Sequence, residues 1–103
     1  MATPSGESER AVKIVDIVAD LAAHDEELTI YAKEPWSCDS EAVLAREPDA
    51  GGLPPEAAAI GAVYFIEVFV ANEFLDGWRA SQQRSVTAKE QCERLIQYAI
   101  NDA

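Results

Sequence analysis

AVYFIEVFV, residues Ala62–Val70, is the most apolar stretch of the sequence, and the rest of the chain must pack around it. Glu67 is its one charged residue, and β-branched and aromatic side chains fill most of the other positions. Gly61 precedes the stretch and Asn72 follows it closely, so the run has the length and borders of a buried central strand.

Periodicity alone does not separate such a strand from a buried helix, because an apolar run has no polar face. The alternative is one continuous helix over residues 55–83. It would hold Gly61 and Gly77 in its interior, at a cost of about 1 kcal/mol each relative to alanine. The two glycines therefore favour a strand over Val63–Val68, followed by a helix over Ala71–Gln82.

The sequence before this stretch predicts a helix, two strands and a second, short helix. Apolar residues at spacings of three and four indicate a helix over Ser8–Ala23. Leu28–Lys33 alternates apolar and polar residues, as a half-buried strand does, and Glu41–Arg46 is expected to pair with it in antiparallel. Glu56–Ile60, opened by two prolines and closed by Gly61, is the short helix.

The C-terminal segment carries the clearest helix signal. Thr87 and Glu90 match a capping box, in which each side chain satisfies the other residue's free amide, and apolar residues then recur at helical spacing. We predict a helix over Ala88–Asn101. The order α-β-β-α-β-α-α indicates an α+β fold, a three-stranded sheet with helices packed mainly on one face. Residues 1–7 are expected to form a disordered tail, and residues 8–103 a single globular domain.

The sequence is strongly acidic, with 19 Asp and Glu against 8 Lys and Arg and a formal net charge of −11 over 103 residues. All but three of the acidic residues precede Arg79. Such a surface repels nucleic-acid phosphates, so we expect no direct binding to DNA or RNA. The simplest explanation of the acids is that they keep a small protein soluble. The other is that an acidic face attracts a basic partner.

Three features that the sequence lacks indicate the expected cellular compartment and the relation to membranes. No apolar run approaches the ~20 residues needed to cross a bilayer. The N-terminal MATPSGESER has neither the basic nor the apolar region of a secretory signal. Cys38 and Cys92 are too few for a disulfide scaffold. We therefore expect a cytoplasmic protein with free thiols and no membrane association.

Candidates for catalysis are few. His24 is the only histidine, and at the end of the first predicted helix it is explained by the helix dipole. Cys38 lies beside Asp39, whose charge disfavours a reactive thiolate, although a Cys38–His24 dyad is an alternative. The cysteines and the histidine lack the spacing of a zinc site, and no phosphate-binding or nucleophile-elbow motif is present. We expect neither a metal nor another cofactor.

Glu67 is the unusual charge, because a carboxylate buried in an apolar stretch must pair, form hydrogen bonds or take up a proton. Arg46 and Arg79 are the candidate partners for an ion pair. A place at an exposed sheet edge would also explain Glu67. Unpaired in a pocket, it would instead be a candidate general acid or base.

Two segments, IYA-x-x-PW at Ile30–Trp36 and YFIEVF at Tyr64–Phe69, resemble a family of short, single-domain bacterial proteins of unknown function. The resemblance covers roughly residues 10–80. It implies a bacterial cytoplasmic protein and transfers no catalytic residue. Small acidic bacterial domains of this kind include immunity proteins and antitoxins, which is an analogy of size and charge.

These observations favour an acidic, non-enzymatic protein-binding domain, whose most specific form is an immunity-type inhibitor of a basic partner. Aromatic residues are enriched at interfaces, and Trp36 lies in a predicted loop. The predicted partner-binding residues, expected to cluster near the strand ends, are Glu26, Glu27, Trp36, Asp39 and Glu41. One alternative is a small enzyme or ligand-binding protein that uses Glu67 or Cys38. The other is a self-associating structural domain.

Overall fold

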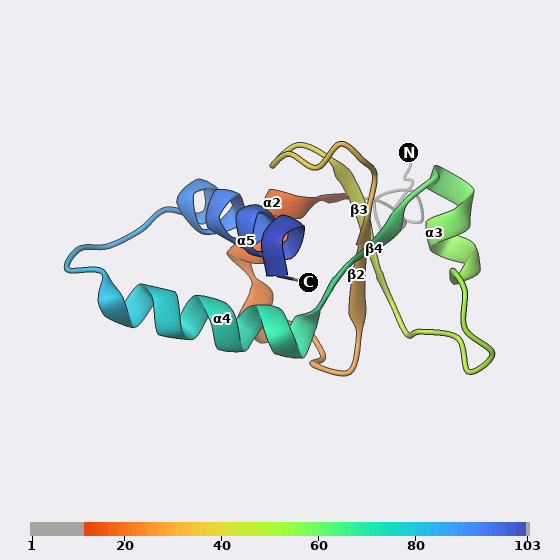
Figure 1. Cartoon of the computed structure of the whole chain (residues 1–103), viewed down its shortest axis with the longest axis horizontal. Coiled ribbons are helices and arrows are strands. Elements are labelled where there is room, and N and C mark those ends of the chain that lie inside the picture. Colours follow the sequence, from red (N-terminus) through yellow and green to blue (C-terminus); the bar gives the residue numbers. More distant parts are fainter. Residues whose placement is uncertain (1–11, 103) are drawn as a thin grey trace, which may run out of the picture.

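The protein combines helices with a four-stranded antiparallel sheet, as a computed structural model of residues 12–102 shows (Figure 1). The α+β prediction is confirmed, but the sheet has one strand more than the three predicted. The tail predicted for residues 1–7 lies outside the described residues. The strand order is β1-β3-β2-β4. The strands are β1 (Val12–Lys13), β2 (Thr29–Ala32), β3 (Glu41–Ala45) and β4 (Val63–Glu67).

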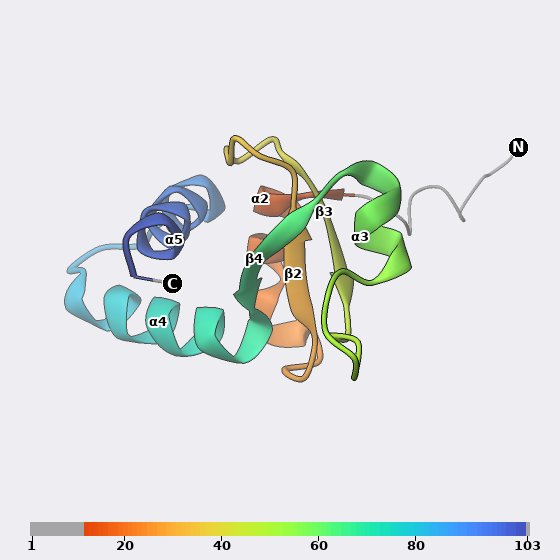
Figure 2. The same cartoon turned by 45° about the vertical axis from the view of Figure 1, so that its right-hand side comes forward.

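Helices cover both faces of the sheet. The core between the sheet and α2, α4 and α5 is the larger one, and α3 packs on the opposite face (Figure 2). The predicted packing mainly on one face thus holds for three of the four α-helices of residues 12–102. The helical elements are α2 (Ile14–Ala19), the short 3-10 helix η1 (Leu21–Ala23), α3 (Pro55–Ile60), α4 (Val68–Ser81) and α5 (Ala88–Asp102).

The helix predicted over Ser8–Ala23 is wrong in its first described part. Val12 and Lys13 extend along β3, opposite Ala42 and Glu41, and the segment Ser8–Ala11 lies outside the described residues. The Ile14 N–H then donates to the Ser40 carbonyl at 3.0 Å. This pairing satisfies an amide that the first turn of a helix would leave free. Helical periodicity gives no sign of the short strand, because it reports side-chain faces and not backbone partners.

The apolar stretch divides into a strand and the start of a helix. β4 pairs with β2 in antiparallel, so the predicted strand is confirmed and the continuous helix over residues 55–83 is wrong. α4 begins at Val68, earlier than the predicted Ala71, and ends at Ser81. Gly61 ends α3 at a φ of 74°, a left-handed conformation that a residue without Cβ adopts without strain.

β2 is buried on both faces, whereas its alternation predicts a half-buried strand. Ile30 and Ala32 belong to the larger core. Tyr31 packs with Val43 and Ala57 on the α3 side and is only 1% exposed. α3 covers the face that the alternation of β2 assigns to solvent, so the local pattern of the strand does not reveal its full burial.

Thr87 and Glu90 form the predicted capping box at the start of α5. The Glu90 N–H donates to Thr87 Oγ1 at 3.0 Å, and the Thr87 N–H donates to Glu90 Oε1 at 2.9 Å. Arg84 Nη2 also donates to Glu90 Oε2 at 2.8 Å. The hydrogen bond from Arg84, followed by the Thr87 amide, lowers the pKa of Glu90 to about 2.

We expect this capping box to make stability depend on pH in the acid range. The contribution of Glu90 is fully present above about pH 4.3, the ordinary glutamate pKa. It is lost as the pH falls toward the folded-state pKa of about 2. Glu90→Gln should therefore flatten the acid part of a plot of unfolding midpoint against pH. Glu93→Gln, on the same helix but outside the capping box, is the control, and an acid profile that Glu90→Gln leaves unchanged would contradict the expectation.

Candidate functional site

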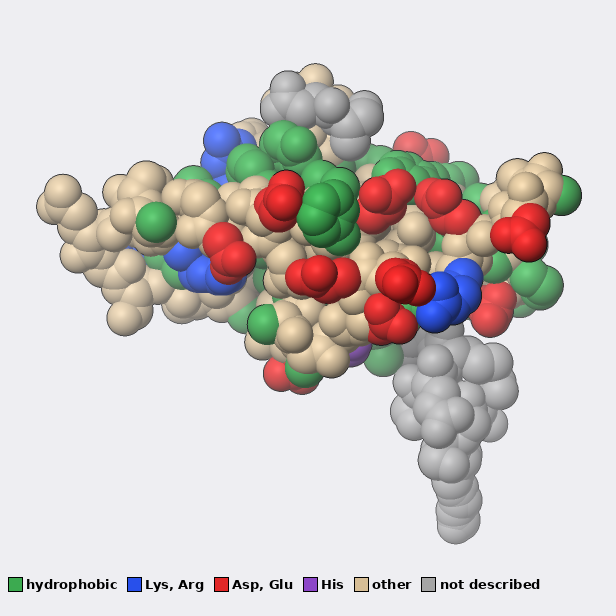
Figure 3. All heavy atoms as spheres, turned by 90° about the horizontal axis from the view of Figure 1, so that it is seen from below, with side chains coloured by type: hydrophobic (Ala, Val, Ile, Leu, Met, Phe, Trp, Pro, Cys, Tyr) green, Lys and Arg blue, Asp and Glu red, His purple; other side chains and the backbone are tan. Residues whose placement is uncertain are grey.

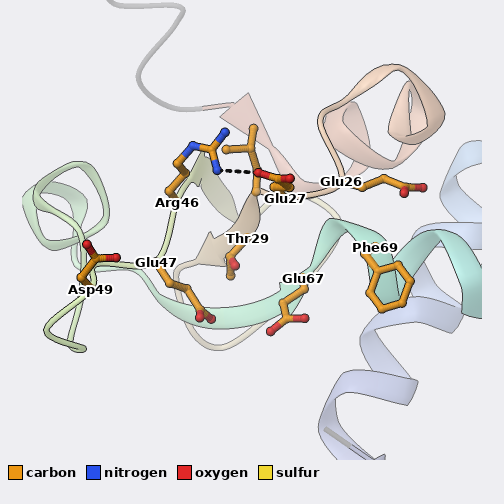
Figure 4. A pocket seen from close by; sticks show the side chains of 9 residues that line it. Glu26, Glu27, Thr29, Arg46, Glu47, Asp49, Glu67 and Phe69 are labelled. Atoms are coloured by element: carbon orange, nitrogen blue, oxygen red, sulfur yellow. Dashed lines mark hydrogen bonds and ion pairs between the residues drawn. The ribbon is translucent and has the colours of Figure 1, made fainter.

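An open hollow of about 620 Å³ lies at the end of the sheet where β2 begins and β4 ends. Five carboxylates and one guanidinium line it (Figure 4). Space filling shows acidic side chains spread across the middle of one face of the molecule (Figure 3). We call this site the acidic hollow. Its lining residues are Glu26, Glu27, Leu28, Thr29, Arg46, Glu47, Asp49, Glu67 and Phe69.

The strand register brings these residues together from three segments. Thr29 lies opposite both Ala45 of β3 and Glu67 of β4. The turn before β2, the segment after β3 and the β4–α4 junction therefore meet at one place. Figure 4 shows the side chains of Glu47 and Glu67 pointing the same way, with the ring of Phe69 on the side of Glu67 away from Glu47. Phe69 is 46% exposed.

Arg46, the one cation that lines the hollow among residues 12–102, is already engaged. Arg46 Nη1 lies 2.9 Å from Glu27 Oε1, and Arg46 Nη2 lies 3.6 Å from Asp25 Oδ2. Glu67 pairs with neither predicted arginine, and within residues 12–102 it makes no ion pair. Arg79 instead pairs with Asp76 on its own helix. Glu67 thus opens into the hollow as an uncompensated carboxylate, the arrangement in which the small-enzyme alternative would use it as a general acid or base.

Three further carboxylates of the hollow are unpaired, as Glu67 is. Glu26, Glu47 and Asp49 make no ion pair within the described part of the chain. A concave surface lined by charges of one sign concentrates its field and attracts opposite charges. The hollow is therefore suited to a cationic group rather than to an anionic substrate.

The charges of the hollow affect the pKa values of two nearby tyrosines, Tyr31 and Tyr64. Burial raises the pKa of Tyr31, and the charges of Glu47 and Glu67 raise it further. The pKa of Tyr64 is raised by burial first, then by Glu67 and Glu47. The two rings meet edge to face at 6.3 Å. Both hydroxyls therefore stay protonated near neutral pH.

The five predicted partner-binding residues divide between the two ends of the sheet. Glu26 and Glu27 line the acidic hollow. Trp36 and Asp39 line a second hollow of about 340 Å³ beside α5. Glu41 lies near that end and pairs with Lys33 at 3.3 Å. The length of β2 separates the groups, because the antiparallel pairing of β2 and β3 places the loop between them far from the turn before β2.

Trp36 contributes to the packing of the protein itself, which contact with a partner would not require. Its indole N–H donates to the Ala32 carbonyl at 3.2 Å. Its ring meets Phe65 edge to face at 4.8 Å and 76°. Among the other aromatics, Tyr98 is half-buried and stacks on Phe74 at 4.2 Å. Partner binding by Trp36 stays a prediction beside this observed packing.

Cys38 and His24 line different hollows, so the structure does not bring the alternative dyad into one cavity. The Cys38 thiol lies 3.9 Å from the Lys89 carbonyl. Burial, followed by the neighbouring Cys38, raises the pKa of Cys92, which disfavours a reactive thiolate there. Within residues 12–102, no cluster of three His, Cys, Asp or Glu side chains has the geometry to hold a metal ion.

Glu47, Asp49 and Phe69 are the hollow residues that sequence reasoning misses. Glu47 and Asp49 lie in the turn-like segment after β3, and Phe69 lies in the first turn of α4. None of the three differs from its sequence neighbours in a way that marks a site. Only the pairing of β2 with both neighbours places them beside Glu26 and Glu67. The one local signal is Glu67 itself, the single charge of the apolar stretch.

Comparison of the sequence and structure with known protein families, with characterised proteins and with solved structures finds no match. A bilayer-spanning helix is also absent from the described part of the chain, where no helix combines sufficient length with sufficient apolar character. The candidate site is therefore interpreted from its own geometry and charge.

Proposed function

We propose that the protein is a non-enzymatic protein-binding domain whose acidic hollow binds a basic segment of a partner. The observation that carries this function is a set of carboxylates that face one open hollow without compensating cations in the described residues. They are Glu26, Glu47, Asp49 and Glu67. Lysine or arginine side chains of a partner would supply the missing charge through charge-assisted hydrogen bonds.

Exposed aromatic surface supports a protein as the partner. Phe69 lines the hollow and is 46% exposed, and Tyr64, on the strand that carries Glu67, is 42% exposed. Interfaces commonly combine aromatic anchors with charged groups around them. The charges would speed association and select the partner, and the aromatic rings would contribute apolar contact area.

An immunity-type inhibitor is the most specific form of this function. An acidic domain of this kind would cover a cationic surface of its target and take the place of a polyanionic substrate. The formal net charge of −11 in 103 residues supports such a role. Trp36, Asp39 and Glu41 would belong to a second contact at the other end of the sheet.

The test is direct binding of a labelled peptide of alternating lysine and valine, with a glutamate–valine peptide as the reference. We expect the full-length chain to bind the lysine peptide and to bind it less tightly as salt rises. The double variant Glu47→Gln with Glu67→Gln should weaken binding about tenfold, because each change removes one carboxylate from the hollow. Fluorescence anisotropy measures the affinities.

A matched control separates the hollow from the general acidity of the chain. Asp20→Asn with Glu56→Gln removes the same charge from two exposed carboxylates that line neither the acidic hollow nor the second hollow beside α5. This control should bind nearly as tightly as the unmodified chain. Equal losses in the two double variants, or no binding of the lysine peptide at all, would contradict the proposed function.

A further inference from the structure

β4 forms an edge of the sheet with an unused side. Among the described residues it pairs with β2 alone, and β1 lies at the opposite edge of the sheet. No described strand pairs with the outer side of β4, although the Glu67 carbonyl, at the N-cap of α4, accepts the first hydrogen bond of that helix. Such an edge presents a row of amide and carbonyl groups to which an extended chain can add as a further strand.

The hydrogen bonds of β2 show which β4 groups point outward. The Val68 N–H donates to the Leu28 carbonyl at 3.0 Å, at the end of the β2–β4 pairing. Successive backbone groups along a strand point in opposite directions, so the Glu67 N–H points away from β2.

The backbone at the other end of β4 is oriented by the pairing of β2 with β3. The Lys33 N–H donates to the Glu41 carbonyl at 2.9 Å, which turns the backbone of Tyr31, two residues earlier, toward β3. Tyr64 lies opposite Tyr31 across the β2–β4 pair. The backbone groups of Tyr64 therefore also point outward.

The free edge and the acidic hollow share Glu67. Its backbone N–H belongs to the edge, and its carboxylate lines the hollow. Tyr64, the other residue with an outward backbone, is 42% exposed, and its hydroxyl lies within the influence of Glu47 and Glu67. A chain paired with β4 would point every second side chain toward this acidic side of the sheet.

We propose that β4 accepts an extended, lysine- or arginine-rich segment of a partner protein as an additional antiparallel or parallel strand. This inference rests on the proposed function and specifies its binding mode. Main-chain hydrogen bonds to Tyr64 and Glu67 hold the segment, and its alternate basic side chains reach the carboxylates of the acidic hollow. The occupant is defined by an extended backbone and by positive charge.

Charge also argues against a second copy of this chain as the occupant. Two chains with a formal net charge of −11 each repel one another. The β2–β4 register shifts between Ile30 and Tyr31, so an added segment would form hydrogen bonds at Tyr64 and Glu67 and not along a continuous ladder. Glu67 places a negative charge at this edge, which repels a second acidic chain and attracts a basic segment.

The test compares Glu67→Pro with Glu67→Gln. Both remove the carboxylate, but only proline also removes the outward N–H. Glu67 has a φ of −73°, close to the value that proline requires, so the change suits the backbone. We expect Glu67→Pro to bind the lysine–valine peptide about tenfold more weakly than Glu67→Gln does. Equal affinities, with both variants folded by circular dichroism, would overturn the inference.

A second comparison uses the unmodified chain and does not depend on the folding of the proline variant. The lysine–valine peptide methylated at alternate backbone nitrogens keeps its charge but cannot add as a regular strand. We expect it to bind at least about tenfold less tightly than the parent peptide. Equal binding of the two peptides would overturn strand addition and leave the proposed function intact. No binding of either peptide would overturn both, and self-association of the chain through β4 in sedimentation would overturn the choice of occupant.

Discussion

Phe65→Ala should lower the free energy of unfolding by about 3–5 kcal/mol, the cost of truncating a buried aromatic residue. Phe65 is 1% exposed and lies in the larger core, where its ring meets that of Trp36 at 4.8 Å. Removing the ring would leave a cavity between β4 and the loop that carries Trp36, and the helices around it close such a space only partly. Urea denaturation followed by circular dichroism measures the change.

Phe69→Ala is the matched control, because it makes the same substitution in the same apolar stretch. Phe69 is 46% exposed and lines the acidic hollow. Its truncation should change stability by no more than about 0.5 kcal/mol, as for other surface positions, while it weakens binding of the lysine peptide. Similar losses of stability at the two phenylalanines would contradict the assignment of one to the core and the other to the site.

Trp36→Ala should destabilise the protein by about 2–3 kcal/mol, somewhat below the cost for a fully buried tryptophan because Trp36 is half-buried. The substitution removes ring packing on Phe65 and the hydrogen bond from the indole to the Ala32 carbonyl. Combined with Phe65→Ala, its effect should be non-additive, with a coupling of about 0.5–1.5 kcal/mol for the edge-to-face pair. Denaturant unfolding of the two single variants and the double variant gives this value.

Trp36→Phe separates packing from partner contact. Phenylalanine keeps an aromatic ring against Phe65 and loses only the indole hydrogen bond, so it should recover much of the stability lost in Trp36→Ala. Unchanged stability in Trp36→Ala, together with lost partner binding, would show instead that Trp36 acts mainly at an interface.

Most of the secondary structure follows from local sequence signals. The capping box at Thr87 marks the start of α5, Gly61 closes α3, and the glycines favour a strand for the apolar stretch. Each signal acts through backbone conformation or a hydrogen bond within a few residues. Local preference therefore agrees with the observed structure at these positions.

The errors occur where a distant segment decides the outcome. Val12 and Lys13 are extended because β3 offers them backbone partners, which no local pattern reports. Tyr31 is buried because α3, formed much later in the chain, covers its face of the sheet. The acidic hollow exists only because β2 pairs with both β3 and β4. The sequence marks Glu67 as unusual, but it does not show which carboxylates surround it.

Amide hydrogen exchange at Tyr64 and Glu67 tests the central claim most directly. The strand register points the amides of these residues away from β2, so in the free protein they should exchange rapidly. Saturation with the lysine–valine peptide should slow both amides strongly, whereas addition of the glutamate–valine peptide should leave them unchanged. Bound lysine–valine peptide with unaltered exchange at Tyr64 and Glu67 would contradict strand addition beside the acidic hollow.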